Sequence, residues 1–211
     1  MKQAKAHSMA EPFIEDRIFS FLPQLKKTAR FLDIATGEGY ILEMLHDRGF
    51  SNLYAADLDD ENFKLSKTVY HFKKTDANKK WPYADGFFDV VVSSETIEHL
   101  ENPSHFMREV SRVLKPKGYL LLSTPSVEGV ISRIYFFLTG ILAFHTTADY
   151  LNNHITVLPS YVIERLAHRA GLRMLAKTYS SFYIPLIAKR ITHPFFLTKF
   201  WGWVAIYKFQ K

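Results

Sequence analysis

The chain has 211 residues, a length that suits one compact domain. Hydrophobic residues make up 47% and charged residues 23%, which are ordinary values for a globular protein and exclude disordered and collagen-like classes. Cysteine is absent, so disulfides, thiolate zinc sites and a cysteine nucleophile are excluded. A net charge of +6 favours anionic partners or surfaces without specifying one.

The first residues and the longest apolar stretch bear on location. Residues 1–10 lack an apolar core, so we expect no secretion signal and a cytoplasmic protein. The longest apolar stretch, 134–144, has 11 residues. Because a membrane-spanning helix needs ~20 such residues, no segment is expected to cross a bilayer.

Taken in chain order, short apolar runs alternate with amphipathic segments. Hydrophobic residues at helical spacing predict an N-terminal helix over 11–23, and a glycine turn separates a buried strand from the next helix. Asn102 and Pro103 predict the start of a later helix, as N-cap and first helical residue. The other expected helices cover 41–48 and 161–170. The expected strands cover 31–34, 53–56, 88–92, 119–122, 172–178 and 203–209. This alternation predicts an α/β fold with a doubly wound sheet, and the last strand is expected to be antiparallel.

The turn after the first expected strand has the features of a nucleoside-binding site. It reads Asp33-Ile34-Ala35-Thr36-Gly37-Glu38-Gly39-Tyr40, and small residues there let a ligand approach the backbone. Asp57 ends the next strand, where its carboxylate can accept hydrogen bonds from two ribose hydroxyls. A dinucleotide motif would place a third glycine at position 42, which is leucine. A ligand without phosphates therefore fits better.

At this point the sequence resembles the class I S-adenosylmethionine-dependent methyltransferases. The resemblance extends from about Phe31 to Ser126, and more loosely to Leu175, through five segments in the order of that family. The segments are residues 32–39, 55–58, 76–77, 85–100 and 112–125. It implies a mostly parallel, seven-stranded, Rossmann-like sheet with helices on both faces, an enzyme, and S-adenosylmethionine as cofactor.

The resemblance also implies roles for individual residues in cofactor binding. Gly37 and Gly39 would surround the methionine part and ribose, Asp33 would hold the amino end, and Asp57 the ribose hydroxyls. The remaining cofactor contacts would come from Asp76 on the adenine amino group, Leu58 and Ala77 on the ring, and Ser94 beside the sulfonium. Ala35 stands where the family usually has glycine, and its methyl is expected to be tolerated if φ is negative.

A carboxylate and histidine cluster follows the expected strand 88–92. Glu95, Glu98 and His99 share the spacing that places residues on one side of a helical turn, and His154 comes later in the chain. In some metal-dependent O-methyltransferases that the sequence resembles, a similar segment and a later histidine hold a divalent ion. The alternative is that Glu98 and His99 only cap and orient the loop. His99 as a general base is a separate hypothesis, weighed against a structural histidine.

We expect one domain, 1–211, with the N-terminal helix followed by three parts. These are the cofactor-binding core 30–126, a lid or substrate insert 127–158, and a C-terminal helix and strands with an aromatic and basic insert, 159–211. Apolar residues leave 134–144 no wholly polar face, so this stretch is expected to bury most of itself. It is expected to form a mobile lid, with Gly140 as a hinge, and to line the acceptor site with the aromatic residues near 195–203. Alternatively, 130–144 and 182–203 pack as extra core or touch a membrane peripherally.

Methyl transfer to an oxygen, less favourably carbon or nitrogen, of a small or lipid-linked molecule is the leading functional hypothesis. The segment Ser93-Ser94-Glu95-Thr96 lacks the Asp or Asn followed by Pro-Pro that base-specific amino-methyltransferases usually carry, which disfavours nucleic acid. The alternatives left open are a metal-assisted 2′-O-methyltransferase of RNA ends and a non-catalytic methyltransferase-like binding protein. The acceptor and the oligomeric state are not fixed by the sequence.

Overall fold

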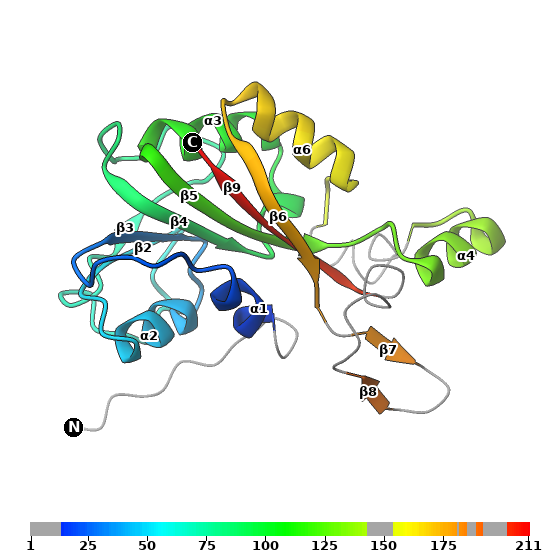
Figure 1. Cartoon of the computed structure of the whole chain (residues 1–211), viewed down its shortest axis with the longest axis horizontal. Coiled ribbons are helices and arrows are strands. Elements are labelled where there is room, and N and C mark those ends of the chain that lie inside the picture. The colour runs from blue at the N-terminus through cyan, green and yellow to red at the C-terminus, as the bar shows by residue number, and fades with distance from the viewer. Residues whose placement is uncertain (1–13, 143–153, 181, 185–188, 192–201) are drawn as a thin grey trace.

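The protein is described from a computed structural model that covers residues 14–142, 154–180, 182–184, 189–191 and 202–211. A seven-stranded open sheet runs through it with helices on both faces, as Figure 1 shows. The strands of this sheet are β1 (Arg30–Ile34), β2 (Asn52–Asp57), β3 (Lys73–Lys74), β4 (Phe88–Ser94), β5 (Leu114–Pro125), β6 (Arg173–Tyr179) and β9 (Val204–Gln210). The helices are α1 (Ile14–Ser20), α2 (Tyr40–Asp47), the 3₁₀ helix η1 (Ile97–His99), α3 (Pro103–Val113), α4 (Val130–Thr139) and α6 (Ser160–Arg169).

The strand order is β3-β2-β1-β4-β5-β9-β6. Strands β1 to β5 are parallel to one another, whereas β9 lies antiparallel between β5 and β6. The order reverses at β1, so the carboxyl ends of β1 and β4 flank the position where open α/β sheets bind ligands. The predicted fold is confirmed, including the number of strands and the antiparallel last strand.

Two hydrophobic layers hold the helices to the sheet. Ile14 and Ile18 of α1 pack with Leu42 and Leu45 of α2 on one face, and all four are fully buried. On the other face, α3 and α6 contribute Phe106, Val110, Ile163 and Ala167 to a second buried cluster. Consecutive residues of β1 divide between these layers, Phe31 with the first and Leu32 with the second. The alternation follows from the pleat of a strand covered on both faces.

Several predicted boundaries agree with the structure. The Asn102 side chain accepts a hydrogen bond from the His105 N–H over 2.9 Å, and Pro103 is the first residue of α3, as predicted. The N-terminal helix is described from Ile14 and ends at Ser20, while residues 11–13 of the predicted span lie outside the described chain. Strand β3 was not predicted, because its two lysines form no apolar run.

Helix α4 contradicts the expectation that its segment buries most of itself. The ribbon of α4 extends away from the sheet in Figure 1. Phe137 is 87% exposed and Leu138 is 74% exposed. Gly140, with φ of 71°, caps the end of α4. Residues 143–144 and 195–201 of the predicted lid and acceptor wall lie outside the described chain.

Part of the predicted aromatic and basic insert forms a small second sheet. Strands β7 (Phe182–Ile184) and β8 (Lys189–Ile191) pair antiparallel beyond the end of β6. No helix in the described part of the chain is both long and apolar enough to span a membrane.

Candidate functional site

The turn after β1 is tied to the end of β2 through one carboxylate. The Gly37 N–H donates to Asp57 Oδ2 over 2.8 Å, and the Leu58 N–H donates to Asp57 Oδ1 over 2.7 Å. Next to them, the Thr36 N–H donates to the Ala56 carbonyl over 3.1 Å. Because β1 and β2 are parallel neighbours, Asp57 holds both turns at the same edge of the sheet.

Three residues of this turn have left-handed backbone conformations, with φ of 60° at Ala35, 53° at Gly37 and 94° at Gly39. At Gly39 an added Cβ would lie 2.7 Å from Leu65 Cδ1, so packing also demands glycine. At Gly37 an added Cβ would meet no atom within 4 Å, so only the backbone favours glycine there. The condition under which the Ala35 methyl is expected to be tolerated, a negative φ, is not met, and its left-handed conformation costs about 1 kcal/mol.

A hollow of about 190 Å³ opens beside these turns. Five of the residues predicted to bind the cofactor line it, namely Ala35, Asp57, Leu58, Asp76 and Ala77. Its other walls come from Thr75, Asn78, Glu95, Thr96, His99 and Leu100. The predicted residues Asp33, Gly37, Gly39 and Ser94 are not among its lining residues. The turns after β2, β3 and β4 therefore converge on one cavity.

Asp33 lies at the end of β1 and is almost fully buried, with 2% exposure. Its Oδ2 accepts a hydrogen bond from the Thr36 hydroxyl over 2.7 Å. Burial raises the pKa of Asp33 to about 7, against the opposing effect of the Thr36 hydrogen bond and with a smaller contribution from the nearby Asp57 charge. A cationic group placed next to Asp33 would therefore stabilise its ionised form.

Asp76 follows β3 and keeps its charge. Its Oδ1 accepts from the Asn78 N–H over 2.9 Å, and its Oδ2 lies 3.1 Å from Lys79 Nζ. The Asn78 N–H, aided by Lys79, holds the pKa of Asp76 below its usual value although partial desolvation opposes them. The Asn78 side chain in turn accepts from the Glu101 N–H over 2.9 Å. This contact joins the turn after β3 to the loop after η1.

The chain leaves β4 through a strained residue. Ser94 Oγ lies 3.0 Å from Ser123 Oγ of β5, and the Glu95 N–H donates to the Ser123 carbonyl over 3.2 Å. Glu95 has φ of 51°, a conformation that non-glycine residues rarely adopt and that often marks functional sites. The sequence predicted Glu95 on the same helical turn as Glu98 and His99, but η1 begins only at Ile97.

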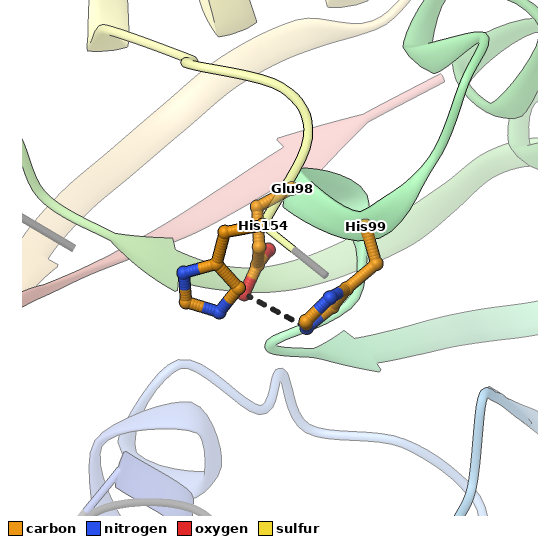
Figure 2. Close-up of side chains that lie close together, drawn as sticks. All are labelled: Glu98, His99 and His154. Atoms are coloured by element: carbon orange, nitrogen blue, oxygen red, sulfur yellow. Dashed lines mark ion pairs between the residues drawn. The ribbon is translucent and has the colours of Figure 1, made fainter. Parts of the chain in front are cut away.

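Glu98, His99 and His154 form a compact group, shown in Figure 2. One ligand atom from each lies within 4.8 Å of the other two. His99 Nε2 lies 4.0 Å from Glu98 Oε1, and the centres of the two imidazole rings are 4.7 Å apart. Glu95 does not belong to this group. The structure thus brings together three of the four residues predicted as metal ligands.

Backbone hydrogen bonds bring His154 to η1 across 55 positions of sequence. The N–H groups of Ile155 and Thr156 both donate to the Glu98 carbonyl, over 3.1 and 2.9 Å. The Thr156 hydroxyl donates to the Leu100 carbonyl over 2.7 Å. Residues 154–156 are therefore fastened along η1, which places the His154 ring beside His99.

Glu98 lies next to the two imidazoles and is 2% exposed. Its Oε2 accepts from the Thr124 hydroxyl over 2.8 Å. No hydrogen bond reaches its Oε1 from the described residues, although His99 is nearby. Burial raises the pKa of Glu98 to about 7, while hydrogen bonds from its own backbone and Thr124, and the His154 charge, act in the opposite direction.

The chemistry of the group fits a divalent ion. A buried carboxylate and two imidazoles are ligand types that Zn²⁺ and Mn²⁺ accept. Metal bonds of about 2.0 to 2.2 Å allow two ligand atoms to lie at most about 4.3 Å apart, so the three side chains would need to close slightly. Both histidines are partly exposed, so small side-chain rotations could bring the ligand atoms closer.

Sequence reasoning missed four lining residues, Thr75, Asn78, Thr96 and Leu100. Each is adjacent in sequence, or within two positions, to a residue that was predicted. Asn78 carried the clearest signal, because it follows Asp76-Ala77 and has a side chain that can both donate and accept hydrogen bonds.

A sheet of this order with a hollow at its carboxyl edge is the arrangement expected of class I S-adenosylmethionine-dependent methyltransferases. The sequence profile of the methyltransferase domain family matches residues 6–177. The chain therefore belongs to the methyltransferase domain family.

Similar proteins of known name include a ubiquinone biosynthesis O-methyltransferase of Caulobacter vibrioides, 31% identical over 100 residues, which cover 44% of this chain and 39% of that protein. The 27-O-demethylrifamycin SV methyltransferase of Amycolatopsis mediterranei is 29% identical over 161 residues, covering 65% and 56%. A solved methyltransferase from Archaeoglobus fulgidus has a TM-score of 0.70 at 19% identity and covers 94% of this chain and 93% of its own, which shows the shared fold. The matched part spans only about 40% to 56% of the first curated relatives.

Proposed function

We propose that this protein transfers a methyl group from S-adenosylmethionine to an oxygen of a small or lipid-linked acceptor. One observation carries the proposal: a single hollow is lined both by Asp57 and Asp76, which are predicted to bind the nucleoside, and by Glu95 and His99. If the first pair binds the nucleoside part of the cofactor, the His99 imidazole lies in the same cavity as that part.

The relatives support a small molecule that accepts the methyl group on an oxygen atom. Two of the similar proteins are named as an O-methyltransferase of ubiquinone biosynthesis and a 27-O-demethylrifamycin SV methyltransferase. These names favour small molecules over the RNA-end alternative, and the presence of Gly37, Gly39, Asp57 and Asp76 supports an enzyme over a non-catalytic binding protein.

The chemistry needed is an in-line displacement. The acceptor oxygen forms a bond to the methyl carbon while the carbon–sulfur bond breaks, and the electron pair of that bond returns to sulfur as a neutral thioether. Holding oxygen, carbon and sulfur in line supplies much of the rate. The acceptor hydroxyl must lose its proton, and the His99 imidazole, which lines the hollow, would take it.

A second way to activate the hydroxyl uses the group in Figure 2. Glu98, His99 and His154 would hold a divalent ion, in which case His99 is a ligand and not the base. When bound, such an ion would supply a Lewis acid that lowers the pKa of a hydroxyl. Either route requires the acceptor oxygen to lie beside His99.

Cofactor binding is the first experiment. Thermal unfolding is measured with S-adenosylmethionine, with its demethylated product and with neither, because a ligand of the native state raises the midpoint. At 100 times the Kd, the expected stabilisation is about 2.7 kcal/mol. No shift with either nucleoside would overturn the proposed function.

A further inference from the structure

Helix α4 has an apolar face that the described part of the protein leaves exposed. Ile134, Phe137 and Leu138 have the spacing that places side chains on one helical face, and Ile141 continues the row past the helix end. Their exposed fractions are 54%, 87%, 74% and 42% in that order. Contiguous exposure of large apolar side chains marks an interaction surface.

Helix α4 itself contains one basic residue and no carboxylate. Residues 129–148 contain Arg133 and no Asp or Glu, and residues 165–211 contain nine Lys or Arg and no Asp or Glu. The first 164 residues therefore carry a net charge of −3, although the whole chain is at +6. Arg133 is exposed, and strand β8 contains Lys189 and Arg190. The excess positive charge thus lies in the C-terminal part of the sequence, where Lys189 and Arg190 belong to β8, and Arg133 is the basic residue of α4.

Helix α4 leaves the sheet at the edge that holds the candidate site. Strands β5 and β6 run in the same direction, because both are antiparallel to β9. The chain enters α4 shortly after β5 ends at Pro125, and β7 follows the end of β6 at Tyr179. In Figure 1, α4 and the β7–β8 pair extend beyond the same end of the sheet. The hollow lies at this carboxyl edge, beside the end of β4.

We propose that α4 docks the protein on an anionic lipid surface. Ile134, Phe137 and Leu138 insert into the headgroup boundary, where an apolar helical face is stabilised, and Arg133 keeps its charge among the phosphates. The lack of carboxylates favours anionic over neutral lipid, since each basic side chain near such a surface adds attraction. Docking would also let a lipid-linked acceptor reach the hollow without leaving the membrane. Only this last consequence rests on the proposed function.

Vesicle flotation with the full chain tests the proposal. The wild-type protein should float with vesicles of phosphatidylcholine and phosphatidylglycerol at low salt, and much less with phosphatidylcholine alone or at high salt. The double variant Phe137→Asp/Leu138→Asp should lower partitioning at least about tenfold, because charge at an inserted position is costly. Val69→Asp is the matched control, because Val69 is a half-exposed aliphatic residue in the connection between β2 and β3. It should float like wild type.

Three results would overturn the proposal. They are no flotation of the wild-type protein, equal flotation of the double variant, and a lipid-free dimer in light scattering that the double variant abolishes. The last result would assign the face to a second copy of the chain. Thermal shift with S-adenosylmethionine on the same samples keeps the two proposals apart, because vesicle binding requires no methyl transfer and cofactor binding requires no vesicle.

Discussion

The two sides of the hollow are built in different ways. The predicted cofactor side comes from turns that follow neighbouring parallel strands, and the Asp57 carboxylate fastens two of those turns by accepting backbone N–H groups. The side with His99 combines η1 with a segment 55 residues later, joined through the Glu98 carbonyl. The first side depends on local chain geometry and the second on a long-range contact. Mutations on the two sides should therefore separate cofactor affinity from turnover.

The largest effect is expected on the acceptor side. His99→Ala should lower kcat by about 100- to 10,000-fold, the usual contribution of a positioned acid or base, while leaving the Kd for the cofactor near its wild-type value. His154→Ala distinguishes the two activation routes, because it should have a similar effect only if the histidines share an ion. Steady-state kinetics and calorimetric titration measure the two quantities.

The control for both histidines is His168→Ala, an exposed position on α6 that should change neither quantity. Activity in excess chelator completes the test. Full turnover under chelation removes the metal route and leaves His99 as the base. Wild-type turnover by both variants would show that the acceptor does not react beside His99.

On the cofactor side, Asp57→Ala should weaken cofactor binding by about 30- to 1000-fold, equivalent to about 2 to 4 kcal/mol for two charge-assisted hydrogen bonds. The same variant should lower the melting temperature, because two backbone N–H groups lose their acceptor. Asp59→Ala is the control, since Asp59 is exposed in the same loop. Unchanged affinity in calorimetric titration would contradict the role given to Asp57.

Asp33 makes the cofactor side sensitive to pH. Its pKa is about 7 in the folded protein and near 3.8 in the unfolded chain, so the folded state retains the proton to higher pH. Stability without ligand should therefore fall as pH rises from about 4 to 7, by about 2 kcal/mol between pH 5 and 7. Asp33→Asn should remove this slope in denaturant titrations.

The affinity for the cofactor should rise with pH, whereas the stability of the free protein falls, if the ligand amino group lies against Asp33. The affinity of the wild-type protein for S-adenosylmethionine should then rise with pH across the Asp33 titration, and Asp33→Asn should bind weakly at every pH. A flat affinity profile in the wild-type protein would show that Asp33 does not contact the charged end of the ligand.

The smallest effect concerns backbone strain. Ala35→Gly relieves a left-handed alanine and should stabilise the protein by up to about 1 kcal/mol, or roughly 2 to 4 °C in Tm. Lys117→Gly is a matched comparison, because Lys117 has φ of 64° outside the site. Both variants should gain stability, but only Ala35→Gly should alter the Kd for the cofactor. Destabilisation by Ala35→Gly would mean that its methyl contributes packing worth more than the strain.

Much of the cofactor side could be predicted from the sequence, because its signals are local. The run Asp33-Ile34-Ala35-Thr36-Gly37 predicts a strand end followed by a tight turn. An acidic residue at the end of the next strand completes the pattern. The sign of φ at Ala35 escaped prediction, since it depends on how the turn meets β2. The two-residue β3 escaped because it exists only by pairing with β2.

The acceptor side was harder to predict, because the argument from residue spacing holds only if the segment forms a regular α-helix. Glu95 and His99 would share a face of an α-helix, but the chain turns at Glu95 with a positive φ and forms only a short 3₁₀ turn afterwards. For α4, an all-round apolar composition normally indicates burial. The exposure of Phe137 shows that the same composition also occurs in a helix that leaves the core.

The position of β9 between β5 and β6 has a consequence for synthesis on the ribosome. Strand β6 pairs with β9 and with no other strand of the seven, so residues 173–179 emerge before the segment that must join them to the sheet. The order of emergence and the order of pairing are therefore inverted at this edge. Until residues 204–210 leave the exit tunnel, β5 also presents an unpaired edge, which is the kind of nascent surface that chaperones shield.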